Sequence, residues 1–401
     1  MLTGKRILLG VSGSIAIYKT CDWVRELKRA GAQVTVVMTR DAAHFITPLT
    51  FAALSGQRVH TDMFAPDAAE LIPHITLARE HDLILIGPAT ARTIARLALG
   101  LAEDLLSTIV LAARIPVIVC PAMNSNMYLH PATQANLRRL SDYGYRLVEP
   151  GCGAMACQEE GPGRLAEWPV VREGVLAALA AQDLAGRKVL ITAGPTFEPL
   201  DPVRYLGNRS SGRMGFALAL TARRRGAEVT LVSGPTQLPD PPGITTIRVT
   251  SAAEMALAVF SRAEECAVVI KAAAVSDFRP ANFSPEKLKK STTLPQLELT
   301  ANPDILKTLG ERKEPQARLP ILVGFAAESQ AGLDEGWRKL ASKNLDLLAF
   351  NDITAAGAGF ATETNLITIL DRDGGQEQLP LLPKEEVADL IWTRVVKLLN
   401  K

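Results

Sequence analysis

The sequence predicts an α/β protein built from two Rossmann-like domains, the first with a parallel sheet and the second with a mixed sheet. Strand-length apolar runs alternate with helix-length patterns along the chain, which is typical of sheets covered on both faces. The pattern also starts twice, at Lys5 and again at Arg187. A chain of 401 residues is long enough for two or three domains of about 150 residues, and the two starts favour two.

The two starts share one order of elements: an apolar run, a glycine turn, a helical pattern and a second apolar run. From Lys5 to Gln33 is 28 positions, whereas from Arg187 to Glu228 is 41. The second copy therefore carries 13 extra residues after its first strand. Open α/β sheets bind ligands at this end of a strand, so we expect a substrate loop there.

Charge and composition narrow the classes of partner. Lys and Arg total 44 against 42 for Asp and Glu, and a net charge of +2 gives no reason to expect nucleic acid or an anionic membrane as a partner. The start of the chain lacks the layout of a signal peptide, and no apolar run reaches the roughly 20 residues of a membrane span. We therefore expect a cytoplasmic protein. Five scattered cysteines argue against a disulfide framework or a zinc site.

The first domain is expected to span residues 1–182 and to contain five strands, or six if residues 57–60 contribute one. Further apolar runs lie at 82–87, 115–120 and 145–148. Helical patterns separate them at 91–111, 132–143 and 170–181. Such alternation predicts right-handed crossovers and a parallel sheet.

The turn after the first strand favours a flavin mononucleotide over NAD. A dinucleotide site should show GxGxxG and an acid that ends the second strand. Here Gly13 and Ser14 open the helix, and the second strand ends in Thr39 and Arg40. Backbone N–H groups and hydroxyls at a helix N-terminus suit a phosphate monoester. Taken alone, the same residues are equally well explained as a tight turn.

Three polar loops, at 87–93, 121–128 and 156–164, should meet at one sheet edge. They contain PATA, PAMNSNMY and ACxxxGPGR, and here the chain resembles the bacterial bifunctional phosphopantothenoylcysteine decarboxylases and phosphopantothenate–cysteine ligases of coenzyme A biosynthesis. The resemblance covers essentially the whole chain. The first half is also similar to the flavin-dependent cysteine decarboxylases.

For the first half this resemblance implies an FMN cofactor that takes up and returns a hydride. It implies that His74 binds and deprotonates the substrate, that Asn124 holds the substrate carboxylate and the flavin, and that Cys157 protonates the enethiol. It also places FMN at Ala89 and Thr90. On residue type alone, a lone histidine or cysteine is more often structural.

After a short linker at 183–186, the second domain is expected to span residues 186–401. Its strands should lie near Val189, Val229, Ile247, Val268, Leu322 and Leu347. A hairpin at 366–370 that turns at 373–375 should add antiparallel pairing, and a helix should cover 385–399.

The second domain repeats the pattern of polar loops, now rich in lysine. Lys339 and Lys343 lie one helical turn apart, and without an acid between them their ammonium groups repel unless an anion binds there. Lysines and an aspartate at a strand end suit a nucleoside triphosphate with Mg²⁺. The sequence lacks a Walker A motif, which excludes a P-loop kinase. By itself, the lysine run at 287–290 is typical of a solvated surface.

The resemblance in this half rests on ITAGPT, EPLDPVR, NxSSGxMG, KAAAVxDF, EKLKK, GFAAE and KNLD. It implies that the carboxylate of 4'-phosphopantothenate attacks CTP, giving an acyl-cytidylate, and that cysteine then displaces CMP. It assigns charge stabilisation to Lys287, the acyl-cytidylate step to Asn208 and Mg²⁺ to Asp277. The implied CTP pocket is Lys271, Ala272, Ala273, Asp277, Lys287, Pro303, Asp304, Ile305, Leu306, Phe325, Lys339 and Lys343. The stretch at 208–212 could otherwise be a helix N-cap, with Ser211 as the capping residue.

Two alternatives remain at this point. An NAD(P)-dependent oxidoreductase with tandem Rossmann-like domains lacks its GxGxxG motif here, and a regulatory flavoprotein without catalysis would not need His74, Asn124 and Cys157. The resemblance further implies a homo-oligomer with trimeric decarboxylase domains and dimeric ligase domains, which together form a dodecamer.

Overall fold

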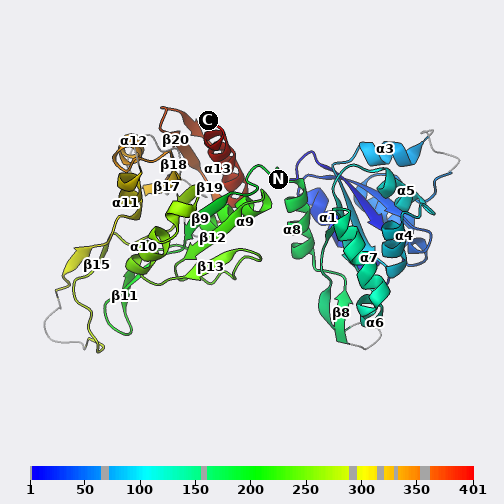
Figure 1. Ribbon diagram of the computed structural model, residues 1–401, viewed down its shortest axis with the longest axis horizontal. Coiled ribbons are helices and arrows are strands. Elements are labelled where there is room, and N and C mark those ends of the chain that lie inside the picture. Colours follow the sequence, from blue (N-terminus) through cyan, green and yellow to red (C-terminus); the bar gives the residue numbers. More distant parts are fainter. Residues whose placement is uncertain are drawn as a thin grey trace. The chain divides into compact units, whose positions relative to one another are not determined.

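The computed structural model describes residues 2–64, 72–154, 160–288, 296–313, 320–328, 333–352 and 362–401. The chain divides into two compact units, Met1–Ala180 and Ala181–Lys401, called here the N-terminal and C-terminal units. Both consist of a sheet with helices on its two faces (Figure 1).

The N-terminal unit contains a parallel sheet with strand order β3-β2-β1-β4-β5-β6. Its strands are β1 (Arg6–Val11), β2 (Gln33–Met38), β3 (Val59–His60), β4 (Leu83–Ala89), β5 (Val117–Pro121) and β6 (Arg146–Leu147). The short β3 is the sixth strand, which the sequence predicted only if residues 57–60 contributed one. A separate hairpin pairs β7 (Gly151–Ala154) with β8 (Glu160–Arg164).

Apolar residues on both sides of each central strand explain the helices on both faces. Ile7 and Leu9 pack under α1, α2 and α8, whereas Leu8 packs on the other face under α3, α4, α5 and α7. The helices are α1 (Ile17–Arg29), α2 (Pro48–Ser55), α3 (Pro73–Arg79), α4 (Ala91–Leu99), α5 (Leu105–Ala112), α6 (Ser125–Leu129), α7 (Pro131–Asp142) and α8 (Trp168–Leu179), with a 3₁₀ turn at Ala42–His44.

The single helical pattern predicted over 91–111 is wrong, because two helices occupy this stretch. Gly100 ends α4 in the left-handed conformation, with φ 69°, which glycine adopts without steric cost. Asp104 then begins α5 with a capping box, in which its carboxylate accepts from the backbone N–H of Ser107. The apolar pattern continued across this break and therefore concealed it.

The C-terminal unit has a mixed sheet with strand order β13-β12-β9-β14-β17-β18-β20-β21. Pairing is parallel from β13 to β18 and antiparallel from β18 through β20 to β21. These strands are β9 (Lys188–Ala193), β12 (Glu228–Ser233), β13 (Thr245–Arg248), β14 (Val268–Lys271), β17 (Ile321–Glu328), β18 (Leu347–Asp352), β20 (Ile367–Asp371) and β21 (Gln376–Gln378).

Two cores again lie on opposite faces of this sheet. Ile191 packs with α9 and α13, whereas Leu190 packs with α10, α11 and α12. The helices are α9 (Arg213–Arg224), α10 (Ala252–Phe260), α11 (Ile305–Arg312), α12 (Leu333–Ser342) and α13 (Lys384–Leu399), with a 3₁₀ turn at Ala263–Glu265.

Three two-stranded pairs complete the C-terminal unit. They are β10 (Phe197–Pro199) with β11 (Tyr205–Gly207), β15 (Phe278–Pro280) with β16 (Leu299–Ala301), and β19 (Thr364–Asn365) with β22 (Leu382–Pro383). The first pair is formed by the insertion after the first strand, and β10 contacts β15.

The predicted fold class is confirmed: both units are α/β, the first with a parallel sheet and the second with a mixed sheet. Among the helices that the structure describes, none is long and apolar enough to cross a membrane.

Candidate active sites

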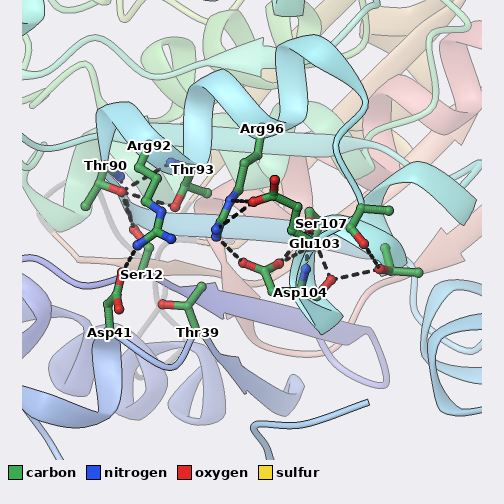
Figure 2. A network of polar contacts seen from close by, with 12 residues as sticks. Ser12, Thr39, Asp41, Thr90, Arg92, Thr93, Arg96, Glu103, Asp104 and Ser107 are labelled. Atoms are coloured by element: carbon green, nitrogen blue, oxygen red, sulfur yellow. Dashed lines mark hydrogen bonds and ion pairs between the residues drawn. The ribbon is translucent and has the colours of Figure 1, made fainter. Parts of the chain in front are cut away.

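In the N-terminal unit, hydrogen bonds join the turns that follow β1 and β4. The Ser12 hydroxyl donates to the carbonyl of Pro88 over 2.6 Å and accepts from the backbone N–H of Thr90 over 3.0 Å. Thr90 is also the N-cap of α4, where its hydroxyl accepts from the N–H of Thr93. Figure 2 shows these side chains in one network. The sequence did not single out Ser12, although a hydroxyl beside a glycine turn was an available signal.

The loop after β2 packs against the same turn. A Cβ placed on Gly13 would lie 2.6 Å from the Cβ of Asp41, so only glycine permits this approach. Thr39 donates its N–H to the carbonyl of Val11, and its hydroxyl accepts from the N–H of Ala42. Asp41 and Arg92 form an ion pair of 2.8 Å across the site (Figure 2). The structure thus brings together Gly13, Thr39 and Thr90.

A cavity of about 440 Å³ lies beside these turns and contains two of the predicted residues, Ser14 and Asn124. Its remaining walls are Ile15, Ala16, Tyr18, Lys19, Ala122, Met123, Ala154, Gly163, Arg164 and Leu165. Apolar and aromatic walls with two cations and an amide suit a planar aromatic cofactor that carries a phosphate. The residues therefore fit FMN.

Close packing holds the β8 wall of this cavity. A Cβ on Gly163 would lie 2.2 Å from the carbonyl oxygen of Met123, and the Ser125 hydroxyl donates to the carbonyl of Pro162 over 2.9 Å. The Asn124 side chain caps α6 by accepting from the N–H of Asn126. Sequence reasoning assigned no role to Lys19, which lies outside the polar loops, or to Arg164, although Arg164 ends the predicted loop at 156–164.

The two residues predicted for proton transfer have different outcomes. His74 lies in the first turn of α3, and its Nδ1 atom is buried without a hydrogen-bond partner among the described residues. It does not line the described cavity. Cys157 lies outside the described residues. An unpaired buried ring nitrogen is unusual, and none of the described residues supplies its partner.

In the C-terminal unit, two threonines of ITAGPT hold the loop that follows β14. The backbone N–H of Ala273 donates to the hydroxyl of Thr192 over 3.1 Å, and that of Ser276 donates to Thr196 over 3.0 Å. Both threonines are fully buried. A third bond joins Ala274 to the carbonyl of Gly194. These contacts place the predicted residues Ala272 and Ala273 beside the end of β9.

The inserted segment also reaches this loop. The side-chain amide of Asn208 donates to the carbonyl of Val275 over 3.0 Å. The alternative that Ser211 caps the next helix is wrong, because the N-cap of α9 is Gly212 in a left-handed conformation without a side-chain cap. The glycine leaves the Asn208 stretch outside the helix.

Lysine side chains gather near the end of β14. Burial, the largest cause, and the positive charges of Lys343 and Lys339 lower the pKa of Lys271 to about 8. The carboxylates of Asp304 and Asp277 act to raise this pKa but do not outweigh burial. Like charges around a half-buried ammonium disfavour its charged form, so the cluster is suited to an anion.

The repulsion expected within the lysine pair is reduced by acids of the chain itself. Lys343 forms an ion pair of 2.8 Å with Asp304, and Lys339 lies 3.7 Å from Glu335. Burial acts to raise the pKa of Asp304, but the hydrogen bond from Lys343 outweighs it and the pKa lies below its ordinary value. The sequence could not show this pairing because Asp304 belongs to another helix, α11.

Helix α11 supplies the neighbouring residues. Asp304 is its N-cap, Ile305 and Leu306 are buried, and Pro303 is exposed. Asp277 is exposed, and its carbonyl accepts from the N–H of Asn302 over 2.8 Å. The described residues contain no cluster of three metal-ligating side chains, so the metal role of Asp277 stays a prediction. Phe325 is half-buried on β17.

Fold and sites together describe a two-unit α/β protein with a cavity at the strand ends of one unit and a cluster of lysines at the strand ends of the other. Residues 1–180 match the family described as Flavoprotein, and residues 184–399 match the DNA/pantothenate metabolism flavoprotein C-terminal domain.

Curated relatives match along their whole length. The coenzyme A biosynthesis bifunctional protein CoaBC of Bacillus subtilis is 46% identical over 402 residues, covering 99% of this chain and 98% of that protein. The Escherichia coli protein of that name is 44% identical over 399 residues, covering 98% and 97%. The chain therefore belongs to the family of bifunctional coenzyme A biosynthesis proteins, with a flavoprotein decarboxylase domain and a ligase domain.

Two solved structures cover one unit each. The C-terminal domain of a coenzyme A biosynthesis bifunctional protein CoaBC is 41% identical, covers 55% of this chain and 99% of its own, and has a TM-score of 0.47. The FMN-dependent cysteine decarboxylase SpaF is 31% identical, with coverages of 45% and 100% and a TM-score of 0.40. The predicted family is confirmed, and the NAD(P)-dependent oxidoreductase is not favoured.

Proposed function

We propose that the ligase domain, residues 186–401, couples cysteine to 4'-phosphopantothenate with CTP, and that the decarboxylase domain, residues 1–182, converts the product to 4'-phosphopantetheine. The observation that carries the first half is the lysine cluster around Lys271, where three ammonium groups lie near one another and an anionic ligand would be favoured. The second half is supported by the cavity that Ser14 and Asn124 share.

In the ligase domain, Lys271, Lys339 and Lys343 neutralise the triphosphate, while Asp277 holds Mg²⁺. The backbone of residues 272–273 and the start of α11 at 303–306 line the nucleotide, with Phe325 behind it. Lys287 stabilises the charge that develops when the substrate carboxylate attacks CTP. Asn208, already bound to the carbonyl of Val275, serves the acyl-cytidylate step.

In the decarboxylase domain, the turn at Gly13 and Ser14 binds the phosphate of FMN, and Thr39 adds a hydroxyl. Ala89, Thr90 and Asn124 would also hold the cofactor. When bound, the flavin supplies a hydride acceptor that makes loss of CO₂ from the cysteine carboxylate feasible. His74 removes a proton from the substrate, Asn124 holds the carboxylate, and Cys157 protonates the enethiol.

Assembly and location complete the proposal. Exposed apolar side chains occur in both units, including Leu49 and Leu129 in the first and Tyr205 and Phe278 in the second. We infer a cytoplasmic homo-oligomer, with trimeric decarboxylase domains and dimeric ligase domains in a dodecamer. Light scattering of the purified chain tests this, and a mass near that of one chain contradicts it.

The function is tested by mass spectrometry of the purified, FMN-loaded chain with 4'-phosphopantothenate, cysteine, CTP and Mg²⁺. Phosphopantetheine, CMP and pyrophosphate should appear together. Accumulation of phosphopantothenoylcysteine would contradict the proposed decarboxylation. If pyrophosphate forms with ATP but not with CTP, the proposal that CTP is the nucleotide substrate is contradicted. If it forms with neither nucleotide, the proposed ligase reaction is contradicted.

A further inference from the structure

The turn that follows α12, residues 343–346, begins at a lysine of the proposed nucleotide pocket and has an unusual backbone. The N–H of Leu345 donates to the carbonyl of Leu340 over 3.0 Å, and that of Asn344 donates to Ala341 over 3.2 Å. These two bonds form a Schellman motif, in which the residue at the place of Asn344 is left-handed and usually glycine. Asn344 has a φ of 51° and is the one non-glycine residue with a positive φ in the part of the chain that the structure describes. A side chain is thus present where the backbone favours its absence, and its contacts show what it does.

The Asn344 amide joins this turn to two other elements. Its Nδ2 atom donates to the carbonyl of Gly310 in α11 over 3.0 Å, and its Oδ1 atom accepts from the guanidinium of Arg372, just after β20, over 3.0 Å. The backbones of α11 and the turn also touch, since a Cβ placed on Gly310 would lie 2.0 Å from the carbonyl oxygen of Lys343. Asn344 and Gly310 together therefore fix the backbone of Lys343 against α11.

A buried carboxylate holds the far end of the turn. The Asp346 side chain is 8% exposed and accepts from Nζ of Lys313 over 2.7 Å and from the N–H of Leu322 over 2.8 Å. It also pairs with Arg372 over 3.2 Å, and the N–H of Arg372 donates to the carbonyl of Asp346. Lys313 is the C-cap of α11 and Leu322 lies on β17, so the turn is bound to a helix and to the sheet as well as to Arg372. A carboxylate with this many donors gives the turn one conformation.

These contacts set the distance between the two sides of the proposed nucleotide pocket. One side is the start of α11, at 303–306, and the other is formed by the lysines of α12 and the turn. The ammonium group of Lys343 pairs with Asp304, the N-cap of α11, over 2.8 Å. Helix α11 is thus tied to the turn at its beginning, at Gly310 and at its end. Because the energy between charges depends on their separation, a shift of the Lys343 backbone would weaken its attraction for a triphosphate.

We propose that Asn344 and Arg372 are positioning residues that hold Lys343 at the nucleotide pocket of the ligase site. This inference rests on the proposed role of Lys343 in neutralising the triphosphate of CTP. The turn fixes the Cα atom of Lys343, so that only the side-chain torsions remain to be ordered when the nucleotide binds. Loss of the amide should therefore weaken the binding of CTP and leave the later attack by cysteine unaffected.

The first test is Asn344→Gly in the full-length chain, because glycine keeps the left-handed conformation and the Schellman motif and removes only the amide contacts. Pyrophosphate release is measured at varied CTP with Mg²⁺, 4'-phosphopantothenate and cysteine. We expect KM for CTP to rise about tenfold, kcat to change less than about twofold and KM for cysteine to stay unchanged. The matched control is Asn400→Gly, at the exposed C-cap of α13, which should retain the native constants. A fall in kcat at unchanged KM for CTP, as partial unfolding would give, would overturn the proposal.

Arg372→Gln provides a second variant should Asn344→Gly fail to fold, because the Arg372 side chain is 38% exposed. It removes the charge that holds the amide oxygen but leaves the bond to Gly310, so KM for CTP should rise less, by about threefold. Its control is Arg394→Gln, since the Arg394 side chain is 37% exposed and pairs with Glu377 on the neighbouring β21. Equal KM values for CTP in the Arg372 and Arg394 variants would refute the role of Arg372.

A double-mutant cycle separates this inference from the function on which it rests. If Asn344 acts through Lys343, the substitution Asn344→Gly should have little further effect on KM for CTP in a Lys343→Gln background. Equal effects in both backgrounds would refute positioning while leaving Lys343 in the pocket. An unchanged KM for CTP in Lys343→Gln alone would instead remove the proposed role of Lys343 and, with it, this inference.

Discussion

The two units begin alike, but their candidate sites depend on different forces. In the N-terminal unit, β1 passes to α1 through a short turn, and glycines let the surrounding loops touch, as Gly163 does against Met123. In the C-terminal unit, a longer connection forms the β10–β11 hairpin and reaches the loop that follows β14, while lysines gather near the end of that strand. One site is therefore governed by close packing and the other by charge, so they should respond to different changes.

The largest difference between the effects on the two activities is expected from His74→Asn. A positioned general base contributes about 100-fold or more, so CO₂ release from phosphopantothenoylcysteine should fall by about that factor. Pyrophosphate release should stay unchanged, because His74 belongs to the other unit. A carbon dioxide assay on the FMN-loaded chain measures the first rate. The control is His130→Asn, at an exposed N-cap where asparagine is equally suitable. Unchanged CO₂ release would remove His74 from the reaction.

Close packing is tested by Gly163→Ala. The added methyl group would meet the Met123 carbonyl, and φ at this position is 141°, which L-residues rarely adopt. Overpacking costs about 1–3 kcal/mol, and we expect FMN affinity, measured by fluorescence titration, to fall about tenfold or more. Gly144→Ala is the control, since its φ is 84° and nothing lies within 4 Å. Equal flavin affinity in both variants would show that this wall does not shape the cofactor cavity.

Charge is tested by the pH dependence of the ligase. With its pKa lowered to about 8, Lys271 is a cation below that pH and loses its charge above it. The value of kcat/KM for CTP should therefore decline above pH 8, by about tenfold at one pH unit beyond the pKa. In Lys271→Arg the charge persists and the decline should move to higher pH. The control is Lys307→Arg, at an exposed position, which should retain the native pH profile. If Lys271→Arg also retains the native profile, Lys271 is not the group whose titration causes the decline.

Much of the fold was predictable because burial leaves a direct trace in the sequence. The strands near Val189, Val229 and Val268 were located from short apolar runs, and the hairpin at 367–378 from its Asp-Gly-Gly turn. The break at Gly100 was missed, since residues on both sides of it face the same core. An apolar pattern reports burial, but it does not report where one helix stops and the next begins.

The sequence by itself determined the two-unit α/β architecture, the polar strand ends and, through its motifs, the family. Only the tertiary structure decided which polar groups meet. Asp201 binds the N–H of Leu288 across 87 positions, and Lys343, just after α12, pairs with Asp304, the N-cap of α11. Periodicity arises from contacts between each residue and a nearby core, whereas a hydrogen bond between distant loops depends on how the sheet brings their ends together. For that reason these contacts became visible only in the folded chain.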